Sequence, residues 1–448
     1  MKIKEKSILI ILICYFCLLL SLSLIRHYNF QTEWSLGENE RIIFNSIQGQ
    51  LFFFDIESVN HLNYHTNFIL ILVFPIYYLF SSTILFMIIK SLVFTIITLF
   101  IYLICRRDFS KRTSLTFSIL FLLSANFILV DDFHPIIIAS VCISMIFYAL
   151  KTNQIKIYFF GLILLLLTKE NMVLTGLFLG IYLFIIQKKQ LGFKTITISI
   201  IFFLFIMLFF PAPYESFIIE RYHDFKTSNF FPELINNLNF YYAIGILLPF
   251  LFLPFFHPIS IIGIPVFLQN LLSNSIFQHC VLKYYSSILI VIFFLASINF
   301  FIKIRTKNQT LFKIMFTLFI VSQILFNIFS YGLMFKENQY EIGLLRDCIV
   351  ETKYRSGSHL LLLSQLKNNS KTALALNNIP KDSKILTQDI FYPHFSQYKE
   401  VGNIDQELFS KEPNYYDWII LEKHYILSNQ IFKINYVICF IHVKPYPI

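Results

Sequence analysis

The sequence predicts an α-helical polytopic membrane protein of about 11 spans, followed by a small α/β domain outside the membrane. Hydrophobic residues make up 56% of the 448 residues and charged residues only 14%, whereas soluble domains contain about 25% charged residues. The apolar residues form long stretches separated by short charged segments, the pattern of helices that cross a bilayer. After residue 331 these stretches stop and the composition becomes ordinary.

The first apolar run, residues 7–25, is long enough to cross a bilayer and follows Lys2, Lys4 and Lys6. It has no small-residue cleavage site and further apolar stretches follow it, so we interpret it as a retained anchor rather than a signal peptide. Because lysines and arginines tend to stay on the cytoplasmic side, we expect the N-terminus in the cytoplasm and the loop 26–66 on the outer side.

Ten further stretches are predicted to be spans, namely residues 83–104, 113–130, 135–150, 157–168, 172–186, 195–211, 239–256, 259–272, 286–302 and 311–331. Several are shorter than the roughly 20 residues that a spanning helix needs. We therefore expect segments 157–168 and 259–272 to be broken or embedded within the protein. The run 68–80 is short and contains Pro75, so we expect a helix on the outer membrane surface.

The distribution of basic residues agrees with this topology. Sixteen lysines and arginines fall at the predicted cytoplasmic ends of the first 331 residues and six at the outer ends, which favours a plasma-membrane protein with its C-terminus outside. The net charge of +10 thus reflects orientation, and no basic domain is present that could follow a nucleic-acid backbone. The sequence also lacks the GxGxxG, GxxxxGK[ST], HExxH and GxSxG motifs of common soluble enzymes.

Residues 332–448 are predicted to form an extracytoplasmic domain that follows the transmembrane domain 1–331. Segments 384–387 and 416–421 have strand-like patterns, and segment 389–397 has a helical one. Cys348 and Cys439 lie in this region and could form a disulfide in an oxidising compartment.

The first outer loop carries the acidic cluster Glu38-Asn39-Glu40 just after the first span. An acidic pair close to the membrane surface suits acid–base chemistry on a substrate that a lipid presents. As a pattern Glu-x-Glu is weak, and its position after the first span is what makes it a candidate site. In the same loop, His65 precedes the apolar run 68–80.

The second outer turn reads Asp131-Asp132-Phe133-His134-Pro135. One interpretation is a capped tight turn, in which Pro135 begins the next helix and Asp132 caps it. One aspartate would suffice for a cap, so the second aspartate and the histidine favour a shared polar site at the membrane surface.

The third outer turn contains Thr168-Lys169-Glu170-Asn171. Lys169 and Glu170 could form an ion pair with each other at the interface. Alternatively, Lys169 points toward a lipid phosphate and Glu170 holds it there. In the loop 213–232, Arg221 is the best candidate for a further phosphate contact.

These elements resemble a known family. An acidic loop after the first span, His65 before the run 68–80, Asp132-Phe133-His134-Pro135 after the third span and Leu167-Thr168-Lys169-Glu170 after the fifth come in that order. Over roughly residues 30–425 the chain resembles a prokaryotic family of polytopic membrane proteins known as domain of unknown function 2079. That family is similar to the GT-C superfamily, the multi-span glycosyltransferases that use polyprenyl-phosphate-linked sugars.

The resemblance implies a GT-C-like fold and transfer of a sugar from a polyprenyl-phosphate-linked donor to an unknown acceptor at the outer face of the plasma membrane. It implies that Glu38, or alternatively Glu40, is the general base of the first outer loop or a metal ligand. Lys169 and Arg221 would stabilise the charge that grows on the lipid phosphate. Metal-independent chemistry without a cofactor is expected, although a divalent cation could bind to Glu38, Glu40, Asp131 and Asp132.

The candidate catalytic residues are therefore Glu38, Glu40, Asp132 and His134, and the candidate substrate-binding residues are His65, Asp131, Lys169, Glu170 and Arg221. Two other functions stay open: a transporter or flippase of a lipid-linked substrate, and a non-catalytic assembly or binding protein built around the outer domain. A transporter of this kind would need ionisable residues deep inside spans and internal repeats, whereas Lys90 is the main charge inside a predicted span.

Overall fold

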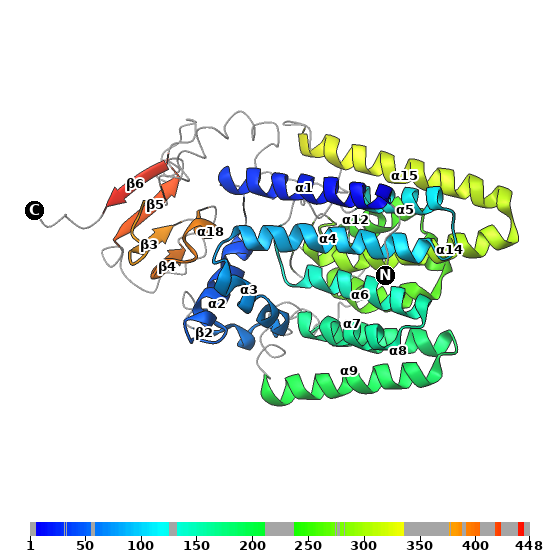
Figure 1. Cartoon of the computed structure of the whole chain (residues 1–448), viewed down its shortest axis with the longest axis horizontal. Coiled ribbons are helices and arrows are strands. Elements are labelled where there is room, and N and C mark those ends of the chain that lie inside the picture. Colours follow the sequence, from blue (N-terminus) through cyan, green and yellow to red (C-terminus); the bar gives the residue numbers. More distant parts are fainter. Residues whose placement is uncertain are drawn as a thin grey trace, which may run out of the picture.

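The computed structural model describes residues 6–30, 32, 34–54, 59–124, 132–210, 237–273, 275, 278–281, 283–335, 376, 378–387, 391–403, 417–422 and 438–442. These residues form a bundle of roughly parallel and antiparallel helices, with a small sheet beyond one end of the bundle (Figure 1).

Five described helices are long and apolar enough to cross a membrane. They are α1 (Lys6–Tyr28), α4 (Ile84–Cys105), α9 (Lys189–Phe209), α14 (Ser287–Lys307) and α15 (Gln309–Phe335). Shorter apolar helices lie between them, namely α5 (Lys111–Ser124), α6 (Ile136–Thr152), α7 (Ile155–Thr168), α8 (Met172–Ile185), α12 (Asn237–Leu247) and α13 (Ile264–Leu271). The predicted class, a mostly helical polytopic membrane protein, is confirmed.

One segment of the bundle is broken, as expected. Between α12 and α13 the chain forms three short 3₁₀ helices, which are η5 (Leu248–Phe250), η6 (Leu253–Phe256) and η7 (Pro258–Gly263). Prolines at 249, 254 and 258 stand in the first turns of these helices, where a missing N–H costs least. The break begins before residue 256, so the predicted span 239–256 is not one helix. By contrast, α7 is continuous, so segment 157–168 is not broken, and the alternative that it is embedded within the protein stays a prediction.

The segment after α1 is more regular than the sequence suggested. It contains α2 (Trp34–Ile47), the strands β1 (Phe53–Phe54) and β2 (Val59–Asn60), and the 3₁₀ helix η1 (His61–Asn63). The expected surface helix 68–80 is divided into the 3₁₀ helix η2 (Phe68–Leu72) and the short helix α3 (Phe74–Leu79). Pro75 in the first turn of α3 explains where this division falls, since it begins a helix more readily than it continues one.

The C-terminal sheet has the order β4-β3-β5-β6. It consists of β3 (Lys384–Thr387), β4 (Glu400–Asn403), β5 (Trp418–Glu422) and β6 (Ile438–His442). β3 pairs in parallel with β4 and β5, whereas β5 and β6 are antiparallel. The two predicted strands are confirmed, and the predicted helix 389–397 is the shorter α18 (Tyr392–Phe395) within the described residues. The boundary near residue 332 stays a prediction, because 336–375 lie outside the described part.

The basic turns gather at the end of the bundle away from the sheet (Figure 1). Asp108 lies in the turn between α4 and α5, and its Oδ2 forms an ion pair with Nζ of Lys151 of α6 at 2.6 Å. The backbone carbonyl of Asp108 accepts a hydrogen bond from Arg305 of α14. Lys188, before α9, donates to the Leu150 carbonyl at 3.4 Å. These contacts join four turns that the charge count assigned to one side.

Cys280 is disulfide-bonded and lies just before η8 (Tyr284–Ser286). Cys14, Cys17, Cys105 and Cys142 are free. The expected Cys348–Cys439 pair stays a prediction, because residue 348 lies outside the described residues.

The C-terminal domain packs directly on the segment that follows α1. Tyr392 of α18 lies against Trp34 with ring centroids 4.0 Å apart, and Phe391 lies against Phe30 at 5.0 Å. Phe30 and Tyr392 belong to a second hydrophobic core, separate from the core of the helix bundle. A Cβ atom at Gly37 of α2 would collide with the Tyr392 ring, so this glycine permits the close approach.

We predict that Gly37→Ala weakens the docking of the C-terminal domain by about 1–3 kcal/mol, because overpacking forces the Tyr392 ring and α2 apart. The measurement is the rate of limited proteolysis between the domain and the bundle in detergent, together with thermal unfolding. Ser35→Ala is the matched control on the same helix, since the described residues offer its hydroxyl no hydrogen-bond partner. Equal proteolysis of wild type and Gly37→Ala would contradict the prediction.

Candidate functional site

Helix α2 separates the two acids of the predicted pair. Successive residues of an α-helix are turned by about 100°, so residues two apart point to nearly opposite sides. Glu38 has a side chain that is 28% exposed and approaches His61, whereas Glu40 is fully buried. The expectation of an acidic pair acting together is therefore wrong, because it treated as an irregular loop what is a helix.

Glu38 faces a buried histidine. Its Oε1 lies 3.9 Å from His61 Nδ1. The other ring nitrogen of His61, Nε2, lies 3.2 Å from the amide nitrogen of Asn67. An amide nitrogen can only donate, so in the assigned orientation Nε2 accepts and the ring hydrogen of neutral His61 sits on Nδ1, toward Glu38.

Glu170 ties the third predicted turn to the first outer segment. Its Oε1 accepts from His65 Nδ1 at 3.0 Å, and its Oε2 accepts from the Thr66 backbone N–H at 3.1 Å. The Glu170 carboxylate is buried, so these two donors replace the water that it lost. Two segments more than 100 residues apart in sequence, both chosen as candidates, thus meet in the structure.

The electrostatics of this cluster fix its charges at neutral pH. Burial alone would raise the pKa of Glu170, but the charge and hydrogen bond of His65, with the charge of Lys169, lower it to about 2. Burial, together with the charges of His65 and Lys169, lowers the pKa of His61 to about 3, although the charge of Glu170 opposes this shift. Glu170 is therefore ionised and His61 neutral, and Lys169 is close enough to act on both.

Lys169 connects the cluster to the second predicted turn. Its Nζ lies 5.9 Å from the centre of the Tyr285 ring, and the hydroxyls of Tyr284 and Tyr285 are 3.0 Å apart. Tyr284 stacks on His134 with centroids 3.9 Å apart and planes 6° apart. His134 Nδ1 also accepts from the Ile136 N–H at 3.2 Å at the start of α6. Since the rings of His61 and His65 lie with their centroids 5.9 Å apart, a series of neighbouring side chains runs from Glu38 to His134.

Asp132 has a different partner from the one expected. Its Oδ1 lies 3.7 Å from Nη1 of Arg26 near the end of α1, and both side chains are buried. The N-cap residue of α6 is Pro135, and the Ile136 N–H donates to His134 Nδ1, so the interpretation of Asp132 as the cap is wrong. Asp132 instead pairs with a buried arginine, which offsets the loss of water around both charges.

The remaining candidates lie apart from this series or outside the described residues. Both oxygens of Glu40 point toward α3 and the C-terminal domain. Asp131 and Arg221 lie outside the described residues. Among the described residues, no group of three or more His, Cys, Asp or Glu side chains is arranged to hold a metal ion.

Sequence reasoning missed several contributors to the cluster. Arg26 was considered only as a charge near the membrane, and the pair Tyr284-Tyr285 was not a candidate. His61 is the most important omission, because it faces Glu38 directly. A signal was present in its spacing, since His61, His65 and Asn67 lie within seven residues and precede an apolar run.

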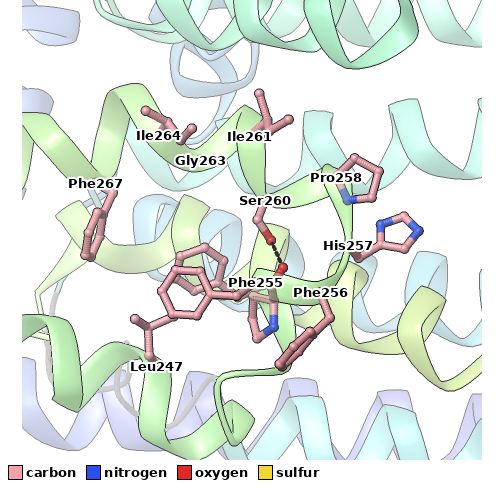
Figure 2. Close-up of a pocket in the computed structure, with 12 residues that line it drawn as sticks. Leu247, Phe255, Phe256, His257, Pro258, Ser260, Ile261, Gly263, Ile264 and Phe267 are labelled. Atoms are coloured by element: carbon pink, nitrogen blue, oxygen red, sulfur yellow. Dashed lines mark hydrogen bonds between the residues drawn. The ribbon is translucent and has the colours of Figure 1, made fainter. Parts of the chain in front are cut away.

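An apolar cavity lies elsewhere in the bundle. It has a volume of about 390 Å³ and is formed by the broken segment between α12 and α13, together with Phe293 of α14. Figure 2 shows Phe255, Phe256 and Phe267 around it, with Ser260 hydrogen-bonded to the Pro254 carbonyl at 2.5 Å. The lining shares no residue with the cluster around Glu38, so this apolar cavity and the polar site are separate features.

The family model described as "Predicted membrane protein (DUF2079)" matches residues 26–435. The chain belongs to this family. The match covers every described residue of the polar series and confirms the resemblance that the motifs suggested. No functionally curated protein matches the chain.

A solved structure shares the fold. The crystal structure of ArnT from Cupriavidus metallidurans bound to undecaprenyl phosphate is similar to this DUF2079 chain, with a TM-score of 0.50. The sequences are 12% identical, and the match covers 95% of each chain. At this level of identity the likeness establishes the fold, and it confirms the predicted GT-C-like architecture.

We predict that acidification from pH 7 to pH 5 destabilises the protein, in part through His61. The unfolded histidine titrates near pH 6.5 while the folded one has a pKa of about 3, so the unfolded state gains a proton first. The contribution of His61 is full above pH 6.5 and is lost as the pH falls toward 3. Between pH 7 and pH 5 the loss is about 2 kcal/mol.

The measurement is thermal unfolding in detergent at pH 7 and pH 5. Because other buried histidines also titrate, the relevant quantity is the difference between wild type and His61→Gln, which should show a smaller drop. An identical drop in both proteins would contradict the prediction.

Proposed function

We propose that this protein is a membrane glycosyltransferase that moves a sugar from a polyprenyl-phosphate-linked donor to an acceptor at the outer face of the plasma membrane. The observation that carries the proposal is the series of side chains from Glu38 through His61, His65 and Glu170 to the adjacent Lys169. This series lies in a fold shared with ArnT, whose structure holds undecaprenyl phosphate. A partly exposed carboxylate and a buried lysine at the two ends of this series would supply a base and an anion-binding group.

Glu38 is the proposed general base. It would accept the proton of the acceptor hydroxyl while that oxygen bonds to the anomeric carbon of the sugar. The bond from this carbon to the phosphate oxygen breaks, and its electron pair leaves with the polyprenyl phosphate. The neutral His61 ring, with its hydrogen toward Glu38, would hold the carboxylate in the ionised, accepting form.

Lys169 is the proposed partner of the leaving phosphate. Its charge lies in a buried setting, where an electrostatic contact is stronger than in water. Glu170 and His65 would keep the turn of Lys169 against the first outer segment. Arg221 remains a proposed second phosphate contact, and Asp131 a proposed substrate contact.

Asp132 and His134 are proposed to hold the site together rather than to react. Asp132 pairs with Arg26, and His134 stacks on Tyr284, whose neighbour Tyr285 faces Lys169. The second predicted turn would therefore set the position of Lys169 through the two tyrosines.

The distribution of charge and the disulfide both support the proposed orientation. The basic turns are at the end of the bundle opposite the site, and basic turns favour the cytoplasm. Disulfides persist in oxidising compartments, and the one at Cys280 lies three residues before Lys283 at the site end. Both observations support an N-terminus in the cytoplasm and a C-terminal domain outside it.

We predict that Glu38→Gln lowers the rate of sugar transfer by about 10²–10⁴-fold, because glutamine keeps the shape but cannot take a proton. The assay uses protein purified into lipid nanodiscs, a panel of radiolabelled polyprenyl-phosphate sugars and a panel of acceptors. Asp382→Asn, an equivalent change at an exposed turn of the C-terminal domain, is the matched control and should keep wild-type activity.

Two outcomes would count against the proposal. Near-wild-type transfer by Glu38→Gln would place the base elsewhere. If wild type transfers no sugar from any donor of the panel, the enzyme proposal itself fails.

We predict a different effect for Lys169→Ala. Its charge attracts the phosphate both in the bound donor and in the transition state, so the change should raise the KM for donor and lower kcat together. Lys307→Ala, at the exposed last residue of α14, is the control. A fall in kcat with unchanged donor KM would mean that Lys169 does not bind the donor phosphate.

A further inference from the structure

Glu40 and Arg41 join the membrane domain to the C-terminal domain. We propose that these two side chains clamp residues 393–399 onto α2 and thereby fix the rotation of this helix, which directs Glu38 toward His61. Their role is positioning rather than catalysis. The link from helix position to sugar transfer rests on the proposed function, whereas the clamp itself does not.

The Glu40 carboxylate is fully used by hydrogen bonds. Oε1 accepts from the Tyr77 hydroxyl at 2.8 Å and from the Gln397 amide at 2.8 Å. Oε2 accepts from the Thr83 hydroxyl at 2.7 Å and from the Ser396 hydroxyl at 2.6 Å. A carboxylate has about four lone-pair sites, so this one has none left for the proton of a substrate. Two of its four donors belong to the C-terminal domain.

Arg41 completes the clamp from the next position of the helix. Its Nη1 donates to the Ser396 carbonyl at 3.0 Å and also to the Tyr398 carbonyl, and Nη2 donates to the Lys399 carbonyl at 3.0 Å. The guanidinium is buried. A planar fork of donors on three carbonyls of one turn fixes direction as well as distance, which a lysine could not do.

Because Glu38, Glu40 and Arg41 lie on one helix, contacts that hold Glu40 and Arg41 also set the direction of Glu38. Glu40 and Arg41 lie on the side of α2 that faces the C-terminal domain, and Glu38 lies about 200° away from Glu40. Rotation of α2 about its axis would therefore break the clamp and move Glu38 away from His61 at once.

The apolar contacts between the two domains do not fix rotation in this way. Trp34 on Tyr392 and Phe30 on Phe391 are ring contacts with centroids 4.0 and 5.0 Å apart. Rings can slide over one another with little change in buried area. Loss of the polar clamp should therefore leave the domain attached but α2 misplaced.

The test measures how accessible residue 38 is to a labelling reagent. Glu38→Cys is labelled with a membrane-impermeant maleimide in the full-length protein, alone and combined with Glu40→Ala, Glu40→Gln, Arg41→Lys or the control Asn39→Ala. Asn39 bonds the Ser35 carbonyl of its own helix, so its replacement should leave the labelling rate unchanged. Wild-type protein, which keeps Glu38, gives the background from the native cysteines.

The clamp predicts a severalfold change in the labelling rate at position 38 with Glu40→Ala and with Arg41→Lys. A smaller change is expected with Glu40→Gln, which keeps the shape and one acceptor oxygen. Gel filtration confirms that each variant is folded, and Glu40→Gln serves if Glu40→Ala is not. Equal labelling rates in all folded variants would overturn the proposal.

Transfer activity then separates positioning from catalysis. With Glu38 intact, Glu40→Gln should lose no more than about tenfold in kcat, whereas a general base would lose about 10²–10⁴-fold. Glu40→Ala should lose about 10²-fold, the cost of misplacing a reacting group by about 1 Å. A loss in Glu40→Gln as large as that in Glu38→Gln would overturn the positioning role. If wild type transfers no sugar, the proposed function fails, and the labelling result alone decides the clamp.

Discussion

Three buried carboxylates organise the end of the molecule that carries the candidate site. Glu40, Asp132 and Glu170 have each left water, and a buried charge is tolerated only when donors or an opposite charge replace the lost solvation. Each carboxylate therefore contacts donors from segments that are distant in sequence. Glu170 binds residues 65 and 66, Asp132 binds the end of α1, and Glu40 binds α3 and the C-terminal domain. The helices could pack without these links, but the outer segments would have no fixed arrangement.

The predictable part of this fold is the part set by hydrophobicity. Long apolar runs marked most of the helices, the charge asymmetry marked the basic end, and the buried-strand patterns marked β3 and β5. These patterns are local, so they can be recognised in one sequence without knowledge of long-range contacts. The break between α12 and α13 was also predictable, because several prolines fall within a short apolar stretch.

The candidate site was predictable in its residues but not in their pairing. Glu38, Asp132, His134, Lys169 and Glu170 were all candidates, and the structure links them. Their partners could not be inferred, because His65 and Glu170 are separated by 105 positions and no local pattern encodes such a contact. The misreading of Glu38 and Glu40 had a local cause. A helix of 14 residues rich in polar groups has no apolar run, and without that signal it was taken for a loop.

Arg41 holds the C-terminal domain through carbonyl oxygens of the main chain. Every amino acid presents the same carbonyl, so this grip does not depend on the side chains at positions 398 and 399. What it demands is the path of the backbone. The exposed side chain at position 399 can therefore change without loosening the grip of Arg41, whereas Ser396 and Gln397 bond Glu40 through their side chains. The Arg41 part of the joint is specific in geometry and permissive in sequence, and the Glu40 part is specific in both.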